Sequence, residues 1–363
     1  MTLQNLLRTR LVNQQIAAQQ FKTPGEIVKW LGAVQAQDYL GALWAVGCRL
    51  RNAKEKDIEK AIADKNIVRT WPMRGTLHFV APEDAKWMLQ LLTPRVIARA
   101  AGEYKRSGLD KKVFDKSRKV LIKTLQGGKQ LERSEMYRVL EEAKIDTSNT
   151  RGLHILGLLA QEGIICFGPR RGKQQSFVLL DEWIPDSKLL KGDEALAELT
   201  KRYFTGHGPA SIQDFVWWSG LTVIEAKKGL ELVKKNFVEE EINGQSYWMT
   251  QTIARGKTSG TYLLPCFDEY LVGYKDRSAA LEILHTKKVF TINGIFNPVV
   301  IINGQVVATW KRSFVKKEVL IQIQSFRALS PIQKLSIEKA TKKYSRFIGM
   351  SMKIQYEISM EKF

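Results

Sequence analysis

Two glutamines separated by one alanine, Gln35 and Gln37, are the side chains of this 363-residue chain that most call for a chemical role. A primary amide both donates and accepts hydrogen bonds, so it can orient a water molecule and place a partial negative charge beside it. It cannot act as a general base near neutral pH. The pair therefore suits a reaction that needs an oriented water but no strong base.

The glutamine pair follows a segment whose sequence predicts an amphipathic helix. Thr23, Pro24 and Glu26 supply a capping residue, a proline at the first helical position and an acidic residue three positions after the cap. Apolar residues then recur at helical spacing up to Val34. Because residues two apart on a helix diverge by about 200°, both amides can address one ligand only if the chain leaves helical geometry near Val34.

A purely structural role for the two glutamines is the alternative. Polar groups inside proteins are commonly hydrogen-bonded, so Gln35 and Gln37 could cap the end of the helix or link two domains. Asp38 directly follows Gln37, so its carboxylate could also contribute to the chemistry of the glutamine pair.

Four further blocks of polar, aromatic and glycine residues follow in order along the chain. They are residues 69–78 (RTWPMRGTLH), 206–220 (GHGPAS leading into DFVWWSG), 264–278 (LPCFDEY ending in KDRS) and 304–312 (GQVVATWKR). With residues 35–37, this ordered set resembles the AlkZ-like DNA glycosylases, a winged-helix family that removes alkylated bases. The tripeptide alone would carry no weight, since it occurs by chance in many proteins.

The resemblance implies that Gln35 and Gln37 are the catalytic pair of a monofunctional DNA glycosylase. Its expected substrates are cationic N-alkylated purines, extending to bulky adducts or interstrand crosslinks. Alkylation at a ring nitrogen makes the base leave readily, so the enzyme must mainly place a water and stabilise an oxocarbenium-like sugar. We expect hydrolysis without strand cleavage, and hence no lyase activity. In a related branch the second glutamine is an aspartate, whereas here Gln37 precedes Asp38.

The candidate DNA contacts are cationic side chains of these blocks and of the segment 168–173 (GPRRGK). They are Arg69, Arg74, His78, Arg170, Arg171, Lys173, Lys311 and Arg312. A positive charge would repel an oxocarbenium centre, so Arg74 and His78 are expected to position phosphates rather than to transfer protons. His78 lies in an apolar strand and could equally be a satisfied core residue.

Asp268 and Glu269 lie among aromatic residues and allow two interpretations. They could support or activate the water, or they could form a buried salt bridge with Lys275 or Arg277, which we favour. The tryptophan pair at 217–218 is expected in the core rather than stacked on a base.

The charge of the chain points to a polyanionic partner. It has 57 Lys and Arg against 37 Asp and Glu, a formal net charge of +20 and a pI near 9.7. Such an excess favours nucleic acid, and we expect double-stranded DNA; a protein that is merely basic is the alternative. A hydrophobic content of 44% is ample for folded cores, and the length suggests two or three modules.

Several other classes of protein are not expected. No HExxH, CxxC pair or His cluster occurs, and no phosphate loop or dinucleotide-type glycine fingerprint, so the sequence predicts neither a metal nor a nucleotide cofactor. Three widely spaced cysteines fit reduced thiols. No apolar run approaches the roughly 18–20 residues that cross a bilayer, and the N-terminus lacks a signal-peptide core. We expect a cytoplasmic monomer without a cofactor and without a membrane partner.

A theme of helices followed by a two-stranded hairpin recurs three times. In the middle copy, residues 133–143 and 149–161 read as helices, and 164–167 and 176–180 as strands around a turn with three positive charges. This is the order of a winged helix-turn-helix, whose second helix can enter a groove while the wing contacts phosphates. The turn could instead simply face water.

The other copies follow the same order. The first has a helix at 55–64 and strands at 67–71 and 76–80; the third has helices at 210–218 and 222–234 and strands at 236–241 and 247–250 around an Asn-Gly turn. Beyond residue 254 the sequence becomes β-rich. Strands are expected at 262–274, 289–291, 296–302, 306–310, 319–325 and 352–358, with a helix at 331–347.

The sequence therefore predicts an α+β protein with tandem winged helix-turn-helix modules and a C-terminal β-rich, barrel-like domain. The expected boundaries are 1–94 (first winged helix, with the glutamine motif), 95–185 (basic connector and second winged helix), 186–254 (third winged helix) and 255–363 (β-rich domain). Residues 95–129 hold eleven Lys or Arg and three Asp or Glu. They could contact phosphates without sequence choice or form a solvated face.

Two functions from different classes follow. The first is the DNA glycosylase; the second is a non-catalytic winged-helix DNA-binding protein or transcriptional regulator. The paired glutamines favour the enzyme.

Overall fold

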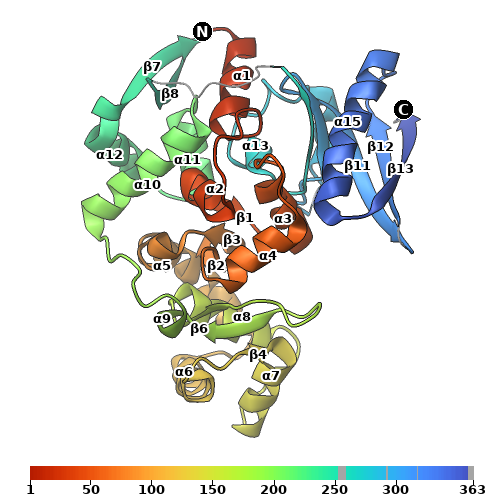
Figure 1. Cartoon of the computed structure of the whole chain (residues 1–363). Coiled ribbons are helices and arrows are strands. Elements are labelled where there is room, and N and C mark those ends of the chain that lie inside the picture. Colours follow the sequence, from red (N-terminus) through yellow and green to blue (C-terminus); the bar gives the residue numbers. More distant parts are fainter. Residues whose placement is uncertain (252–258, 292, 317, 359–363) are drawn as a thin grey trace. The chain divides into compact units, whose positions relative to one another are not determined.

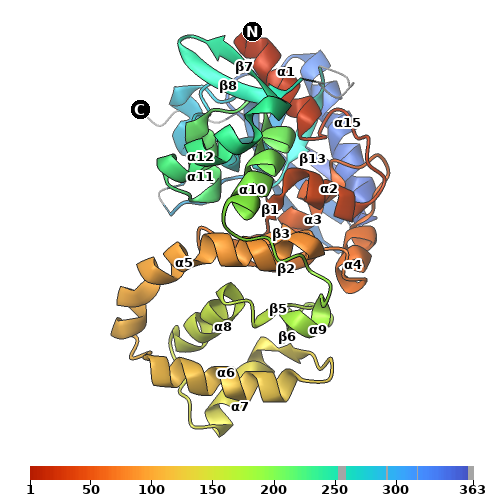
Figure 2. The same ribbon diagram turned by 90° about the vertical axis from the view of Figure 1, so that its left-hand side faces the viewer.

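The computed structural model describes residues 1–251, 259–291, 293–316 and 318–358. The chain forms two compact units: unit 1 contains Met1–Ile58 and Thr200–Phe363, and unit 2 contains Glu59–Leu199. Helices and strands occur in both units, so the fold is mixed α+β, as expected (Figures 1 and 2).

The N-terminal part of unit 1 carries the glutamine motif. Its elements are α1 (Leu3–Asn13), α2 (Pro24–Leu31), β1 (Ala33–Gln35) and α3 (Tyr39–Gly47), after which α4 (Glu55–Ala63) leads into unit 2. Helix α2 begins as predicted, because Thr23 Oγ1 accepts from the Glu26 N–H and Glu26 Oε2 accepts from the Thr23 N–H. It ends at Leu31, since Gly32 adopts a φ of 76° that ends the helical path.

The chain returns to unit 1 through α10 (Gly192–His207). The elements that follow are α11 (Ile212–Ser219), α12 (Val223–Val233), a short 3₁₀ turn (Lys234–Asn236) and the hairpin of β7 (Phe237–Ile242) with β8 (Gln245–Thr250). Asn243 and Gly244 both have positive φ, 52° and 76°, which is the geometry that an Asn-Gly hairpin turn requires. The third predicted order of helix, helix and hairpin is therefore present.

A five-stranded sheet forms the remainder of unit 1. Its strands are β9 (Thr261–Leu264), β10 (Val299–Ile302), β11 (Gln305–Val315), β12 (Glu318–Ser325) and β13 (Ser351–Ile358). The order is β13-β12-β11-β10-β9, antiparallel except for the parallel β12–β13 pair. Over the described ranges this sheet is open rather than closed into the expected barrel. Helix α15 (Pro331–Ile348) contacts β9 and β13, so the sheet buries apolar surface against a helix instead of against itself.

The strand expected over residues 262–274 is wrong in its second half. Strand β9 ends at Leu264, and a one-turn helix, α13 (Glu269–Val272), follows. Asp268 causes the change, because its side chain accepts the N–H of Tyr270 and caps this helix. Residues 283–289 are also helical, as a 3₁₀ turn (Ile283–His285) and α14 (Thr286–Val289), so the strand expected at 289–291 is reduced to an isolated bridge between Phe290 and Phe296.

Unit 2 contains the hairpins of the first two predicted copies in one sheet. Its helices are α5 (Pro82–Arg106), α6 (Lys111–Leu125), α7 (Arg133–Glu142), α8 (Arg151–Gln161) and α9 (Leu180–Trp183). Its strands are β2 (Val68–Met73), β3 (Thr76–Val80), β4 (Leu131–Glu132), β5 (Ile165–Phe167) and β6 (Ser176–Leu179). They lie in the order β3-β2-β5-β6-β4, with Arg69 opposite Phe167 where the two hairpins meet.

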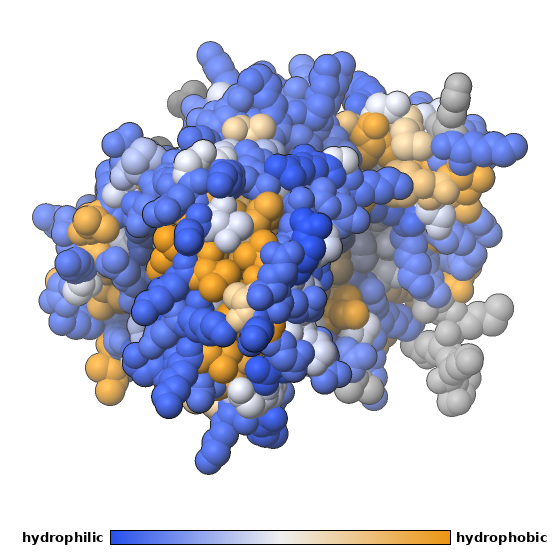
Figure 3. Space-filling model, turned by 90° about the horizontal axis from the view of Figure 1, so that it is seen from below, coloured by the Kyte–Doolittle hydropathy of each residue, from blue (hydrophilic) through white to orange (hydrophobic). Residues whose placement is uncertain are grey.

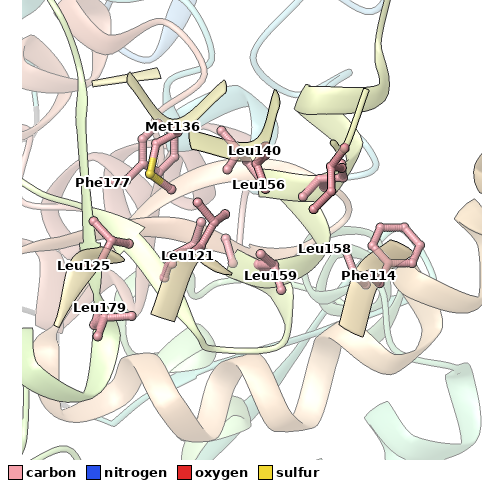
Figure 4. Close-up of a cluster of buried hydrophobic side chains, with 14 of the residues drawn as sticks. Phe114, Leu121, Leu125, Met136, Leu140, Leu156, Leu158, Leu159, Phe177 and Leu179 are labelled. Carbon is pink, nitrogen blue, oxygen red and sulfur yellow. The ribbon is translucent and has the colours of Figure 1, made fainter. Parts of the chain in front are cut away.

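The core of unit 2 lies between α6, α7, α8 and β6, whose apolar side chains point toward one another in Figure 4. Leu121, Met136, Leu140 and Leu159 are fully buried there. Helical spacing predicts inward faces with Met136 and Leu140 on α7 and Leu156 and Leu159 on α8, as found, but Leu153, expected with them, is 48% exposed. The elements of the middle copy lie within two residues of their predicted bounds.

The predicted domain boundaries can be compared with the elements only where the structure describes the chain. The boundary between residues 94 and 95 falls inside α5, so most of the basic connector is helical. The boundary between 254 and 255 lies outside the described residues. The division into four modules stays a prediction.

Candidate active site

Gln35 ends β1 and Gln37 follows it in a bend, so neither residue is helical. The chain leaves helical geometry at Gly32, as the two glutamines require if they are to address one ligand. Ala36 between them is fully buried, Gln35 is 7% exposed and Gln37 is exposed. Since successive residues in an extended chain project to opposite sides, Ala36 packs inward while Gln37 reaches solvent.

A buried carboxylate anchors the backbone of Gln35. The Gln35 N–H donates a 3.0 Å hydrogen bond to Oε1 of Glu269, which has no exposed surface. Oε2 of Glu269 accepts from the Trp218 indole N–H at 2.9 Å and lies 3.1 Å from Nε2 of His207. One carboxylate thus joins the end of β1 to α11 and to the end of α10, and it fixes the point from which the Gln35 side chain starts.

His207 is a donor within this network. Its ring is fully buried and stacked on Tyr203, with 4.8 Å between centroids and 12° between planes. Nε2 faces the Glu269 carboxylate and therefore carries a proton. Nδ1 has no hydrogen-bond partner within the described ranges, so protonating it would bury an unpaired N–H. In the tautomer with its proton on Nε2, His207 donates to the Glu269 carboxylate.

Asp268 forms the second buried charge pair of this region. Both of its oxygens accept from the Arg49 guanidinium at 2.8 Å, in a bidentate pair with both side chains almost fully buried. Gln14 accepts from Arg49 Nη2 at 3.0 Å and donates to the Glu269 carbonyl at 3.2 Å, so it joins the two pairs. Burial alone would lower the pKa of Arg49, but facing Asp268 raises it above its ordinary value.

These contacts decide between the two interpretations of Asp268 and Glu269. Both carboxylates are buried and bonded to protein groups, which matches the interpretation as buried pairs. The prediction that a buried salt bridge forms here is confirmed, because Asp268 pairs with Arg49. The predicted partners, Lys275 and Arg277, are wrong. Arg49 lies more than two hundred positions earlier in the sequence, at the end of an apolar helix, where spacing alone could not connect it with Asp268.

Arg312 is brought next to the glutamine motif. Its Nη2 lies 3.7 Å from Oδ2 of Asp38, and its Nη1 donates to the Tyr344 hydroxyl at 2.9 Å. Asp38 occupies the N-cap position of α3, directly after Gln37. The carboxylate that could have aided the glutamines is thus engaged by a cation. Lys311, the other candidate on β11, is exposed.

The candidates on the β2–β3 hairpin belong to unit 2 and are held inside it. Arg69 is 5% exposed, donates to Gln175 Oε1 at 2.9 Å and lies 4.5 Å from the centre of the Phe167 ring. Arg74 occupies the turn with a φ of 55°, and its Nη2 lies 3.2 Å from Nε2 of His78. His78 has no exposed surface. The geometry of His78 matches the core alternative, and it orients Arg74.

The predicted basic turn between β5 and β6 is present in unit 2. Arg170 forms an ion pair with Glu59. Arg171 is 47% exposed and lies 3.5 Å from Glu135, and Lys173 is exposed. Arg171 and Lys173 are therefore the members of this turn that solvent and a ligand can reach.

The basic run at 95–129 forms parts of α5 and α6. Several of its charges are paired along the helix surface: Lys111 and Arg118 lie 2.7 and 2.6 Å from the Asp115 carboxylate. Figure 3, viewed from the side of α6 and α7, shows a mostly hydrophilic face with hydrophobic side chains gathered near its centre. Both expected alternatives for residues 95–129, a solvated helix face and a surface that contacts phosphates, are compatible with this surface.

The prediction that both tryptophans lie in the core is wrong for one of them. Trp218 is fully buried, but Trp217 is 42% exposed, with its indole N–H on the Val272 carbonyl and the Arg277 guanidinium 4.9 Å from its ring. Neighbouring residues on a helix point about 100° apart, so α11 cannot turn both side chains inward.

The thiols offer no alternative nucleophile. Burial raises the pKa of Cys48 to about 11 and that of Cys266 to about 12, and it raises the pKa of Cys166 as well. Within the described ranges, no three His, Cys, Asp or Glu side chains gather where they could hold a metal ion. None of the helices there is long and apolar enough to cross a membrane.

Comparison with known proteins agrees with the motif blocks. The model of the family described as DNA glycosylase AlkZ-like matches residues 28–347. An interstrand DNA cross-link repair glycosylase from Streptomyces sahachiroi is 27% identical over 343 residues, which is 90% of this chain and 91% of the relative. The solved structure of the DNA glycosylase AlkZ of the same organism superposes with a TM-score of 0.81 at 25% identity, over 99% of both chains.

Proposed function

Because the chain belongs to the DNA glycosylase AlkZ-like family, we propose that it hydrolyses the N-glycosidic bond of cationic N-alkylated purines in double-stranded DNA. Bulky adducts and interstrand crosslinks are included in the proposal, since a relative of similar length is named for crosslink repair. The proposed enzyme is monofunctional, works as a monomer and needs no cofactor.

The reaction requires little proton chemistry from the protein. The bond between C1′ of the sugar and the purine nitrogen breaks, and its electron pair neutralises the positive charge of the alkylated base. The oxygen of water bonds to C1′, and a water proton passes to solvent, leaving an abasic site. No general acid is needed for the departing base, so the protein must position the water and stabilise the positive charge at C1′.

Gln35 and Gln37 are the proposed groups for this task. Their amide oxygens would orient the water and place partial negative charge toward C1′. The observation that carries the proposal is the anchoring of the Gln35 N–H on buried Glu269, directly beside exposed Gln37. A rigid backbone next to a solvent-accessible amide is what an oriented nucleophile requires.

Each of the carboxylates described above near the glutamines has a partner of its own, which bears on specificity. Asp268 and Glu269 are buried in their own pairs, and Asp38 lies against Arg312. A neutral base leaves too poorly for an oriented water alone, so we propose that substrates must already carry a positive charge.

Several of the remaining candidates would supply DNA contacts. We assign winged-helix roles to the helix and hairpin modules, with Arg171 and Lys173 of the exposed turn on phosphates. Lys311 and Arg312 would act near the glutamine motif. Arg69 and Arg74 would contribute charge at the β2–β3 hairpin, where His78 positions Arg74.

The test is the charge requirement of base release. Duplexes carrying one N7-methylguanine or one neutral modified guanine of similar size would be incubated with the protein and analysed for free base and abasic sites. We expect release of the cationic base alone, with the DNA strand intact until alkali is added. Equal release of both bases would contradict the mechanism, and strand cleavage without alkali would contradict the monofunctional assignment.

A further inference from the structure

A basic groove within unit 1 has no part in the site described above. It runs between α15 and the segment that follows α3, and it comprises two adjoining hollows of about 800 and 520 Å³. Both hollows are lined by Arg51, Lys343 and Arg346; one adds Lys339 and the other Lys54. Neither lining includes an aspartate or a glutamate. We call these five cations and the hollows between them the α15 groove.

The cations of the α15 groove are not neutralised by the protein. Within the described ranges, none of the five forms an ion pair with a carboxylate. Arg51 Nε donates to the Gln19 carbonyl at 3.3 Å, and Lys343 Nζ donates to the Cys48 carbonyl at 2.7 Å. Backbone carbonyls therefore hold two of these side chains in the groove while leaving their charge uncompensated.

The cations on α15 are arranged along one line. Lys339, Lys343 and Arg346 occupy positions i, i+4 and i+7, which share one face of a helix. At 1.5 Å per residue they span about 10 Å of the helix axis. One strand of DNA advances about 3.4 Å per phosphate along the duplex axis, so the row is long enough to follow several consecutive phosphates.

Lys343 is partly buried in the groove. Burial is the main cause that lowers its pKa to about 8; the neighbouring charges of Arg346 and Arg49 act in the same direction, and Cys48 opposes them. A bound anion would relieve this repulsion, since an opposite charge nearby favours the protonated ammonium.

We propose that the α15 groove binds the phosphodiester backbone of DNA, at a place separate from the glutamine motif. The inference rests on the proposed function and deepens it by adding a second contact for the same substrate. A linear polyanion fits a row of cations along one helix face, and four of the five side chains are exposed, so a phosphate backbone can reach them. The contact is independent of sequence, because phosphates carry no base information.

Salt dependence of DNA binding tests this proposal. Affinity for an unmodified duplex would be measured over a series of KCl concentrations for the full chain and for Lys339→Gln/Arg346→Gln. The matched control is Lys287→Gln/Lys342→Gln, which removes the same charge from exposed side chains outside the groove lining. Thermal unfolding of all three proteins would show that they remain folded. Anionic lipid vesicles would serve as the competing ligand.

The groove variant is expected to bind more weakly than the control and to lower the slope of log K against log salt by about 2, roughly 0.9 per lost phosphate contact. With DNA saturated by enzyme, its single-turnover base release should equal that of the wild type. Equal affinity and slope for groove variant and control would overturn the proposal, as would a loss confined to vesicles. If the wild type releases no base from any duplex, the proposed function fails. The difference in salt slope between the groove variant and the control still tests whether the groove binds DNA.

Discussion

At the residue scale, the glutamine motif depends on buried charges that are fully partnered inside unit 1. Arg49 and Asp268 neutralise each other, and Glu269 uses both oxygens on Gln35, Trp218 and His207. Buried ionic groups lower the stability of the fold only a little when each has its partner and its hydrogen bonds. In the proposed mechanism these pairs support the motif and take no part in the chemistry.

The Arg49–Asp268 pair gives a stability prediction. Arg49→Met leaves the Asp268 carboxylate buried without a counter-charge and should lower the free energy of unfolding by about 3–5 kcal/mol. Arg49→Met/Asp268→Asn removes the stranded charge and keeps an oxygen for the Tyr270 N–H, so it should recover much of the loss. Urea unfolding measures both. A double variant no more stable than the single would show that the stranded charge is not the cause.

Lys343 gives a prediction of pH dependence. Its pKa is about 8 in the folded protein, against 10.5 for an ordinary lysine. Between these pH values the unfolded chain binds a proton that the folded chain has released, so this group makes stability rise with pH. Lys343→Met lacks the group. The unfolding free energy of the variant minus that of the wild type should therefore fall by up to about 3 kcal/mol from pH 7.5 to 10.5.

The measurement is urea unfolding of both proteins in the absence of DNA. Tyrosines that titrate at high pH are common to the two chains, so their contributions cancel in the difference. A difference that stays constant across this pH range would contradict the proposed burial of the Lys343 charge.

At the element scale, the turn that ends α2 sets the direction of β1. Gly32 has a φ of 76°, and a Cβ there would lie 3.2 Å from the Cβ of Arg202. Gly32→Ala should cost more than 1 kcal/mol, on the order of the strain of a left-handed alanine plus crowding, and should slow base release by displacing Gln35. Gly349→Ala is the control, since Gly349 has a φ of 68° with open space around it.

Urea unfolding and single-turnover base release would be measured for both alanine variants. A Gly32→Ala variant that matches the control in stability and the wild type in rate would show that this turn does not position the motif.

Local sequence signals predicted much of the element structure. The capping residues of α2, the Asn-Gly turn after β7 and the helical spacing of α7 and α8 each act within a few residues, so they can be seen without the fold. The strand expected through residue 274 failed because Asp268 caps a short helix in the middle of an apolar run. The sheet is open rather than closed into a barrel, and β9 contacts α15. This contact joins segments far apart in the sequence, so local signals could not predict it.

The candidate site was predictable in part. Gln35 and Gln37 stood out by their type and by the end of an amphipathic helix. Arg49 and His207 were missed because their partners lie far away in sequence, and a single chain offers no signal for such pairs. A lone arginine closing an apolar helix was the one available hint of a buried ion pair.

At the scale of the whole molecule, unit 2 is one continuous stretch of chain, whereas unit 1 needs two separate stretches. Unit 2 has its own hydrophobic cluster, which is what independent folding requires. A fragment of residues 54–199, which keeps all of α4, should unfold cooperatively in urea and give a dispersed amide NMR spectrum. A collapsed spectrum without cooperative unfolding would show that unit 2 depends on unit 1.

The net charge of +20 also acts at this scale, because it draws the whole protein to DNA regardless of the lesion. Binding alone therefore cannot distinguish the enzyme from a non-catalytic DNA-binding protein. Chemistry has to be measured at equal occupancy of the DNA.

The most direct measurement is the single-turnover release of N7-alkylguanine from a duplex by the wild type and by Gln35→Ala/Gln37→Ala, with both proteins saturating the DNA. We predict release by the wild type and a loss of at least about a hundredfold in the variant, the order expected when groups that stabilise a transition state are removed, with binding unchanged. Release by the variant at the wild-type rate would contradict the assignment of the chemistry to the two glutamines.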